Sequence, residues 1–444
     1  MSLTNGPSFS EEQQLAAHGY RPVLARKLSL KYLVAFGLNY LQPIGPALIF
    51  GMLMEASGGS VALPYLVAFI GMLFSLYSYV ILSKKYPLSG ALYSYVSNEL
   101  GSYIGTIAGW LLILDYIFIP TITLVSASHY ITAIFPQTNY EIVLIMLTCL
   151  LAVINIVGIR FTAMISLLIL AIEIFVVFLF LVFCKHWVVI TPTVNLFSLA
   201  PFHISSTSAL LSASAIAIFG YLGFDAISTL AEETYTPSKL VPRSMLVCLI
   251  IGGIIAFLSG YLGSLVAPSV SALSAIDTYH LNSMLFYVAE IVSNHNFALI
   301  YAFTFIIAMI ATNLVGTASA SRLLFGMGRD QVRFLNLFSK VHPRFKTPYI
   351  SILVISGICI IIGSLSSITQ IAELINYGAL SSFILLNISA CYYIYKNKGL
   401  NIIILIRNCS RPRGASSRGS DRGIQFRVIS LLNKFSCKRH LNCN

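Results

Sequence analysis

The chain has 444 residues, of which 57% are hydrophobic and only 9% are charged, and its mean hydropathy is +0.85. Soluble domains carry about 25% charged residues, and a soluble chain of this size cannot bury several runs of ~20 apolar residues. The composition therefore excludes a soluble domain and predicts an all-α polytopic membrane protein within the lipid bilayer.

The net charge of +12 at pH 7 would suit a nucleic-acid-binding protein, but the position of the basic residues argues against one. Residues 399–444 contain nine Lys and Arg against the single acid Asp421. Most of the remaining basic residues fall between apolar segments, as the positive-inside rule expects of membrane proteins. We therefore expect no nucleic-acid partner.

The eight cysteines form no Cys-x-x-Cys pair, and the eight histidines form neither a cluster nor an i, i+4 pair. This pattern indicates neither a disulfide framework nor a metal site. No paired nucleophile and base stand at catalytic spacing. We therefore expect no metal, no cofactor and no enzyme activity.

The first half of the chain contains five apolar segments behind a polar tail, residues 1–31, that ends in basic residues. The predicted spans are 32–54, 62–82, 104–127, 141–158 and 162–184. Residues 86–103 are expected along the cytoplasmic face, and the loop 185–206 is expected outside. The first span is interrupted at 39–46, where two prolines and a glycine break the helix.

The second half contains five further apolar segments. The predicted spans are 207–230, 244–267, 297–325, 349–366 and 372–395, with an external loop at 268–296. With the N-terminus in the cytoplasm, every basic cluster of the body lies on the cytoplasmic side. The sequence thus predicts about ten spans in the cell's inner (cytoplasmic) membrane.

The sixth predicted span contains Gly220 and Gly223 beside Tyr221, Phe224 and Asp225. Glycines in the middle of a membrane span can serve close helix packing. A mid-membrane acid costs several kcal/mol unless it has a partner or a function, so Asp225 favours a substrate site at a broken helix. The two interrupted spans are five apart, which predicts inverted repeats of five spans at 32–184 and 207–395.

Several spaced stretches resemble the amino acid–polyamine–organocation permeases. They are Phe219 to Thr234 with Thr236-Pro237 and Val241-Pro-Arg243, then Lys85-Tyr-Pro-Leu-Ser-Gly90, then Ser321-Arg-Leu-Leu-Phe-Gly-Met-Gly-Arg-Asp330. Residues 109–120 are most similar to the putrescine-importer branch. The resemblance covers about residues 30–395. It implies the five-plus-five fold of the sodium-coupled leucine transporter, with discontinuous helices 1 and 6, and uptake coupled to protons or sodium.

Two features depart from this family. Typical members have a Gly-x-Gly break in span one whose N–H groups hold an amino acid carboxylate, but here the sequence is Pro43-Ile-Gly-Pro46, and proline has no N–H to donate. This favours a cationic substrate. The family has roughly twelve spans, whereas residues 399–444 form a basic tail that we expect to be disordered and not the family's native ending. A truncated or frame-shifted gene and a lipid-binding tail are the two explanations.

Asp115 is the main candidate for contact with a cationic substrate, because it lies near the middle of its predicted span and precedes Tyr116. An acid followed by an aromatic ring suits an ammonium group, although a hydrogen bond to a neighbouring helix is the alternative. The full predicted substrate site is Tyr40, Gln42, Gly45, Asp115, Tyr116, Gly220, Tyr221, Gly223, Phe224 and Asp225.

Further residues are candidates for coupling or gating. Glu173 is central in span five, and because burial favours the neutral form of a carboxyl it is a candidate proton carrier, with contact to a polar helix interface as the alternative. Thr312 and Ser319 are candidate sodium ligands or plain helix-packing residues. Glu232 and Glu233 are expected to form an ion-paired gate with Arg243 or Arg322, or else to lie in solvent.

The sequence therefore predicts a secondary transporter that imports amino acids or polyamines by alternating access, with a proton or sodium ion as its coupling partner. The alternative is a transporter-like receptor that binds the same ligands without moving them. Accumulation of a labelled substrate would distinguish the two.

Overall fold

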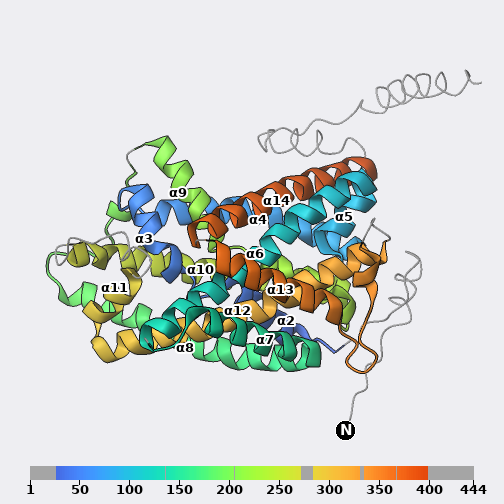
Figure 1. Ribbon diagram of the computed structural model, residues 1–444. Coiled ribbons are helices and arrows are strands. Elements are labelled where there is room, and N and C mark those ends of the chain that lie inside the picture. The colour runs from blue at the N-terminus through green and yellow to red at the C-terminus, as the bar shows by residue number, and fades with distance from the viewer. Residues whose placement is uncertain are drawn as a thin grey trace, which may run out of the picture. The chain divides into compact units, whose positions relative to one another are not determined.

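The computed structural model describes residues 27–135, 137–204, 206–271, 284–330, 335–366 and 368–398. Residues Met1–Tyr393 form one compact unit, and Ile394–Asn444 are separate from it. The predicted tail at 399–444 and most of the predicted tail at 1–31 lie outside the described residues. Figure 1 shows the helices of the first unit.

The described residues form helices and contain no β-strand. The α-helices are α2 (Leu30–Leu41), α3 (Pro46–Ser57), α4 (Ala62–Lys85), α5 (Ala91–Leu100), α6 (Ser102–Ile134), α7 (Tyr140–Val157), α8 (Ile159–Ile190), α9 (Thr207–Phe219), α10 (Pro237–Ser271), α11 (Met284–Val292), α12 (His295–Arg329), α13 (Tyr349–Leu365) and α14 (Ile368–Lys398). Three 3₁₀ helices are η1 (Ala200–Phe202), η2 (Phe224–Glu233) and η4 (Asn336–Ser339).

Eight of the described segments are long and apolar enough to cross a membrane, or nine if the bent pair α2 and α3 counts as one span. This agrees with a polytopic membrane protein. The ninth predicted span forms α13, which has 17 residues. At 1.5 Å per residue, α13 is about 25 Å long, near the lower limit for crossing a hydrocarbon core of ~30 Å.

The first predicted span is broken where the sequence places its prolines. Helix α2 ends at Leu41, and Gln42 adopts a left-handed backbone with φ of 58°. Pro46 then occupies the first turn of α3, where its missing N–H would have no helical partner in any case. The axes of α2 and α3 differ by 42°. The predicted interruption of this span is confirmed.

The sixth predicted span is broken at its glycines. Helix α9 ends at Phe219, and Gly223 has φ of 122°, a conformation that favours glycine. The chain continues as η2, ten residues of 3₁₀ helix. Since 3₁₀ runs longer than three or four residues are uncommon, η2 is an unusual element. The predicted interruption of this span is also confirmed.

The two broken helices lie side by side and run in opposite directions. Helix α2 packs on η2, and α3 packs on α9. The amide of Leu28, just before α2, donates to the Glu233 carbonyl at the end of η2 at 3.0 Å. At the opposite end of this contact, a side chain on Gly223 would place its Cβ 2.7 Å from the Leu41 nitrogen. The two breaks are therefore adjacent.

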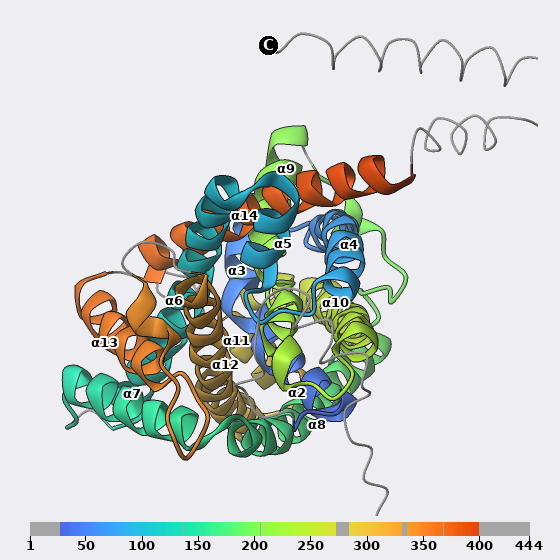
Figure 2. The ribbon, with the colours of Figure 1, turned by 90° about the vertical axis from the view of Figure 1, so that its right-hand side faces the viewer.

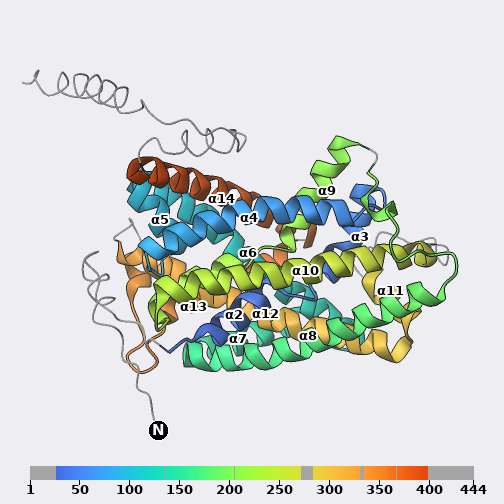
Figure 3. The same cartoon turned by 180° about the vertical axis from the view of Figure 1, so that it is seen from behind.

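Long helices surround this pair. Helix α2 contacts α8, α10 and α12, and it lies among them in the view along the bundle (Figure 2). From behind, α10 runs beside α4 on one side, with α8 on the other (Figure 3), and it packs on both. Because packed protein surrounds the two breaks, their irregular backbone avoids lipid, as a membrane interior requires.

The close approach at Gly223 leads to the first prediction. Gly223→Ala should lower the free energy of unfolding by roughly 2 to 5 kcal/mol, since a Cβ would press on the backbone of α2 in a conformation that L-residues avoid. Unfolding of the purified protein by SDS measures this loss. Gly71→Ala on α4 is the control, because its Cβ would meet nothing within 4 Å. Equal stability of the two variants would mean that the breaks are not tightly packed.

Candidate functional site

Asp115 places an unpartnered carboxyl inside the helix bundle. It lies on α6, its exposed fraction is 0%, and neither carboxyl oxygen has a hydrogen-bond partner among the described residues. Gly378 of α14 packs against this turn of α6, where an added Cβ would lie 3.2 Å from the Asp115 nitrogen. Buried carboxyls without a partner are rare because their desolvation is costly. Asp115 is therefore a candidate ligand for a cation.

Asp225 is also fully buried, but its carboxyl is well satisfied. The Tyr116 hydroxyl donates to Oδ2 at 2.6 Å and the Tyr79 hydroxyl donates to the same oxygen at 3.3 Å, while the Gly223 amide lies 3.3 Å from Oδ1. Asp225 and Asp115 are close enough to interact electrostatically. Two acids thus share one apolar region, and only Asp115 lacks hydrogen-bond donors.

A small cavity lies between the two breaks. Its volume is about 20 Å³, enough for about one water molecule. Its lining comes from both broken helices and from α6 and α12. The lining residues are Tyr40, Leu41, Gln42, Gly45, Leu48, Ile119, Thr123, Phe219, Gly220, Leu222 and Thr312.

Two polar groups at this cavity are unpartnered in the described part of the chain. They are the Tyr40 hydroxyl and the Gln42 Nε2. The Tyr40 ring packs edge-on against Tyr116, with ring centres 5.8 Å apart, and Tyr116 holds Asp225. The polar groups of the cavity and the two acids therefore belong to one connected region.

Two predicted site residues serve the packing around this region. The Tyr221 hydroxyl donates to the Tyr65 carbonyl at 2.9 Å. The Phe224 ring packs on Tyr79 and Phe383. These contacts support the second break. Of the ten predicted substrate-site residues, Tyr40, Gln42, Gly45 and Gly220 line the small cavity, whereas Asp115, Tyr116, Tyr221, Gly223, Phe224 and Asp225 do not.

Glu173 lies at the first break. Its Oε1 accepts a hydrogen bond from the Ile44 amide at 2.8 Å, and its Oε2 has no partner within the described residues. Ile44 lies two residues before Pro46, the first residue of α3, and the dipole of a helix favours negative charge near its N-terminal end. Glu173 on α8 thus ties the backbone of the first break to a neighbouring span.

Thr312 and Ser319 are not brought together. The Thr312 hydroxyl donates to the Asn39 carbonyl at 2.7 Å, which joins α12 to α2, whereas the Ser319 hydroxyl donates to the carbonyl of Val315 in its own helix at 2.9 Å. The two residues are roughly 10 Å apart along α12. They therefore cannot bind the same ion, and their contacts resemble those of helix-packing residues.

Two buried ion pairs join the end of η2 to α12. Arg322 pairs with Glu233, and both side chains are almost fully buried. Arg329 binds Glu232 through two hydrogen bonds, each 2.9 Å long. The Ser89 amide and hydroxyl also donate to Glu232, at 3.0 and 2.9 Å. We name these five residues the η2 latch.

The prediction that Glu232 and Glu233 pair with Arg243 or Arg322 holds for one of the two arginines. Arg322 does pair with Glu233, but Arg243 is exposed on α10 and Glu232 binds Arg329 and Ser89 instead. The sequence contained a signal for both missed residues, because each lies in a stretch that carries the permease resemblance. The alternative of solvated glutamates is also excluded, since their exposed fractions are 3% and 2%.

Two larger cavities lie away from this region. One of about 570 Å³ lies beside the α3–α4 turn, and one of about 540 Å³ lies beside the loop that follows α8. Neither is lined by any of the predicted substrate, coupling or gate residues. The unpartnered polar groups, rather than the size of a cavity, therefore make the region between the breaks the candidate site.

Comparison with known proteins gives the family. A sequence model described as amino acid permease matches residues 30–407. The low-affinity putrescine importer PlaP of Escherichia coli (strain K12) is 28% identical over 372 residues, which cover 83% of this chain and 81% of the relative. The branched-chain amino acid permease BcaP of Bacillus subtilis (strain 168) is 25% identical, over 86% of this chain and 83% of the relative.

A plant transporter is also similar to this chain. The vacuolar cationic amino acid transporter 4 of Arabidopsis thaliana is 23% identical over 381 residues, which cover 81% of this chain and 62% of the relative. The predicted resemblance to the putrescine-importer branch is confirmed, and so is the expectation of a transporter rather than an enzyme. Because the family match extends over most of the sequence, the chain belongs to the amino acid permease family, within the amino acid–polyamine–organocation superfamily.

Proposed function

We propose that this chain is a secondary transporter that imports a cationic amino acid or a polyamine across the cytoplasmic membrane by alternating access, with its N-terminus in the cytoplasm. The observation that carries the proposal is the Asp115 carboxyl, which is fully buried and has no partner among the described residues. A substrate ammonium group would supply the missing partner.

Electrostatics favour a cation over an anion. Asp115 and Asp225 lie in one apolar region, and an unpaired acid there costs several kcal/mol. The first break offers no compensating N–H groups at Pro43 or Pro46, and its Ile44 amide already donates to Glu173. A substrate carboxylate would therefore meet two acids and few free donors, whereas an ammonium group would meet acids and the Tyr40 and Tyr116 rings.

The relatives support this substrate class. One is named a putrescine importer and another a cationic amino acid transporter. Putrescine carries two ammonium groups and no carboxylate, which suits a region with two acids. The branched-chain amino acid permease among the relatives shows that the family also includes proteins named for neutral substrates. The two acids of this chain support a cationic substrate instead.

The size of the cavity and the position of the η2 latch support alternating access. A space of about 20 Å³ holds roughly one water, so a substrate requires the two breaks to separate. The antiparallel arrangement of α2–α3 and α9–η2 is the arrangement expected of equivalent helices in two inverted repeats of five spans. We propose this five-plus-five fold, with the latch closing the cytoplasmic side.

Proton coupling is proposed at Glu173. The residue combines a hydrogen bond to the Ile44 amide with one unpartnered oxygen, so a proton can be taken up without loss of that hydrogen bond. A protonated Glu173 would no longer place a full negative charge near the positive, N-terminal end of the α3 dipole. Protonation would thereby alter the first break directly.

The substrate proposal predicts that Asp115→Asn abolishes uptake of a cationic substrate. Labelled putrescine and ornithine, offered to vesicles that contain the purified protein and a proton gradient, should accumulate roughly thirtyfold or more slowly, which corresponds to about 2 kcal/mol for a lost buried charge partner. Glu55→Gln, an exposed acid on α3, is the matched control. Wild-type uptake by Asp115→Asn would remove Asp115 from the site, and saturable binding without accumulation by the unmodified protein would indicate a receptor.

The coupling proposal predicts a changed pH dependence in Glu173→Gln. The amide oxygen keeps the hydrogen bond to Ile44 but cannot carry a proton, so uptake should become nearly independent of external pH. Glu173→Leu should also lose stability, because the Ile44 amide would be left without an acceptor at a cost of about 1–3 kcal/mol. An unchanged pH profile in Glu173→Gln would assign the coupling proton to another group.

The η2 latch predicts a large effect from one small change. Glu233→Gln leaves the Arg322 guanidinium buried without a counter-charge, and a broken buried pair costs about 3–5 kcal/mol. Unfolding in detergent should therefore occur at a clearly lower temperature. Glu290→Gln, which removes the exposed partner of His295, is the control and should unfold as the parent does. Equal melting of both variants would argue against a latch.

A further inference from the structure

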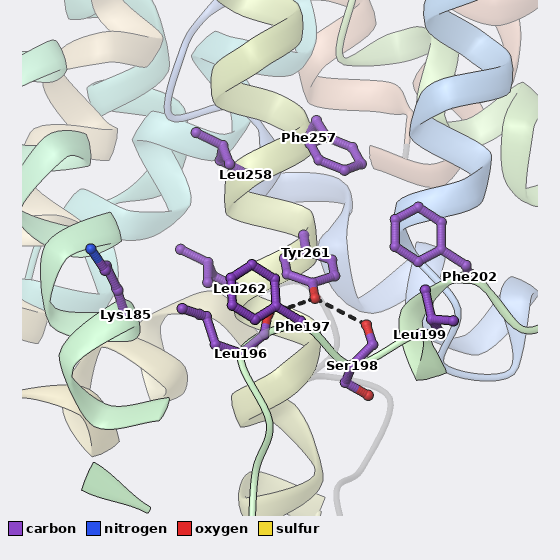
Figure 4. Close-up of a pocket in the computed structure, with 10 residues that line it drawn as sticks. All are labelled: Lys185, Leu196, Phe197, Ser198, Leu199, Phe202, Phe257, Leu258, Tyr261 and Leu262. Carbon is purple, nitrogen blue, oxygen red and sulfur yellow. Dashed lines mark hydrogen bonds between the residues drawn. The ribbon is translucent and has the colours of Figure 1, made fainter. Parts of the chain in front are cut away.

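A second, open groove lies on the outside of the helix bundle, away from the two breaks. Its volume is about 540 Å³, within the range of small-molecule pockets. Helix α10 forms its floor, the end of α8 forms one side, and residues 196–202 of the loop after α8 form the other (Figure 4). The lining residues are Lys185, Leu196, Phe197, Ser198, Leu199, Phe202, Phe257, Leu258, Tyr261 and Leu262.

The loop that follows α8 packs against the apolar side of α10 and not over the C-terminal end of that helix. The Tyr261 hydroxyl donates to the carbonyls of Leu196 and Ser198 at 2.8 and 3.0 Å, and Phe202 packs on Phe257 and Tyr261. Helix α10 continues from Leu262 to Ser271, about 14 Å further. The groove therefore lies beside a membrane span and does not reach the C-terminal end of that span.

The surface around the groove is apolar and exposed. The exposed fractions of Phe197 and Leu199 are 85% and 77%, and those of Val189 and Ile190 at the end of α8 exceed half. Residues 191–206 contain no Asp, Glu, Lys or Arg. Such a surface is unfavourable in water but suits the boundary between hydrocarbon and headgroups.

Lys185 is the one charged residue of the lining. Its side chain is exposed and forms none of the ion pairs found among the residues that the structure describes. Lys185 lies roughly one and a half turns before the end of α8 at Ile190, a depth from which a lysine side chain reaches the headgroup layer.

We propose that this groove is a binding site for an anionic phospholipid, with one acyl chain along Phe257, Leu258 and Leu262 and the phosphate on the Lys185 ammonium group. The floor of the groove is apolar and suits an acyl chain, and the basic residue at one side suits the phosphate of such a lipid. One basic residue near the surface contributes about 1 kcal/mol for anionic lipid, or roughly a fivefold preference.

A tryptophan reporter tests the proposal in the full-length protein. Phe197→Trp is introduced with Trp110→Phe, and the protein is reconstituted in phosphatidylcholine vesicles that contain increasing fractions of phosphatidylglycerol brominated on its acyl chains. Fluorescence of the same protein without the reporter is subtracted. Bromine should quench the reporter at about fivefold lower mole fraction when it is carried by phosphatidylglycerol than when it is carried by phosphatidylcholine.

Two lysine variants identify the source of the preference. Lys185→Gln should remove the fivefold difference and keep quenching by both lipids, while Lys84→Gln, an exposed lysine at the far end of α4, should preserve the difference. Equal quenching by the two lipids in the parent, no quenching by either, or an unchanged preference in Lys185→Gln would each overturn the proposal. Leu199→Trp serves as a second reporter if Phe197→Trp does not fold.

Discussion

The contact between Gly223 and the backbone of Leu41 is the constraint on which the rest of the site depends. It brings the end of α2 against the start of η2, where an added Cβ would lie within 3 Å of two backbone atoms. With the breaks held this close, Tyr40 reaches Tyr116, and the acids of α6 and η2 share one region. Any side chain larger than hydrogen at this position would separate the two halves.

The two acids differ in a way that their sequence positions do not reveal. Asp225 receives two tyrosine hydroxyls and one backbone amide, and a carboxylate with such donors is stable without a ligand. Asp115 receives none from the described residues. Hydrogen bonds thus distinguish the acid that is already satisfied from the acid that is not, because burial is the same for both.

Much of this arrangement could be predicted from particular residues. Pro43 and Pro46 predicted the first break, since two prolines three residues apart interrupt the hydrogen bonds of a helix, and Gly220 and Gly223 predicted the second. These features are local. Glu173 was predicted as a proton carrier, but its hydrogen bond to Ile44 joins residues 129 positions apart. Such a partner depends on tertiary packing, which residue spacing within one span does not encode.

The same reason explains the missed partner of Glu232. Arg243 is close in sequence, whereas Arg329 and Ser89 are 97 and 143 positions away. The family motifs contained both residues, but nothing in their spacing indicated that they meet. Gly326 makes the meeting possible, because its Cα lies so close to the Ser89-Gly90 turn that an added Cβ would be 2.7 Å from the Gly90 Cα.

Helix η2 connects the candidate cation site to the latch. Asp225 is its second residue, and Glu232 and Glu233 are its last two. At about 2.0 Å per residue, the ten residues span roughly 20 Å. A 3₁₀ segment has poorer hydrogen-bond geometry than an α-helix, so contacts at its two ends must help to hold η2 in this conformation. Asp225 supplies them at the start, through the hydroxyls of Tyr79 and Tyr116. Glu232 and Glu233 supply them at the end, through Arg329 and Arg322. One element therefore joins the region of the two acids to the ion pairs of the latch.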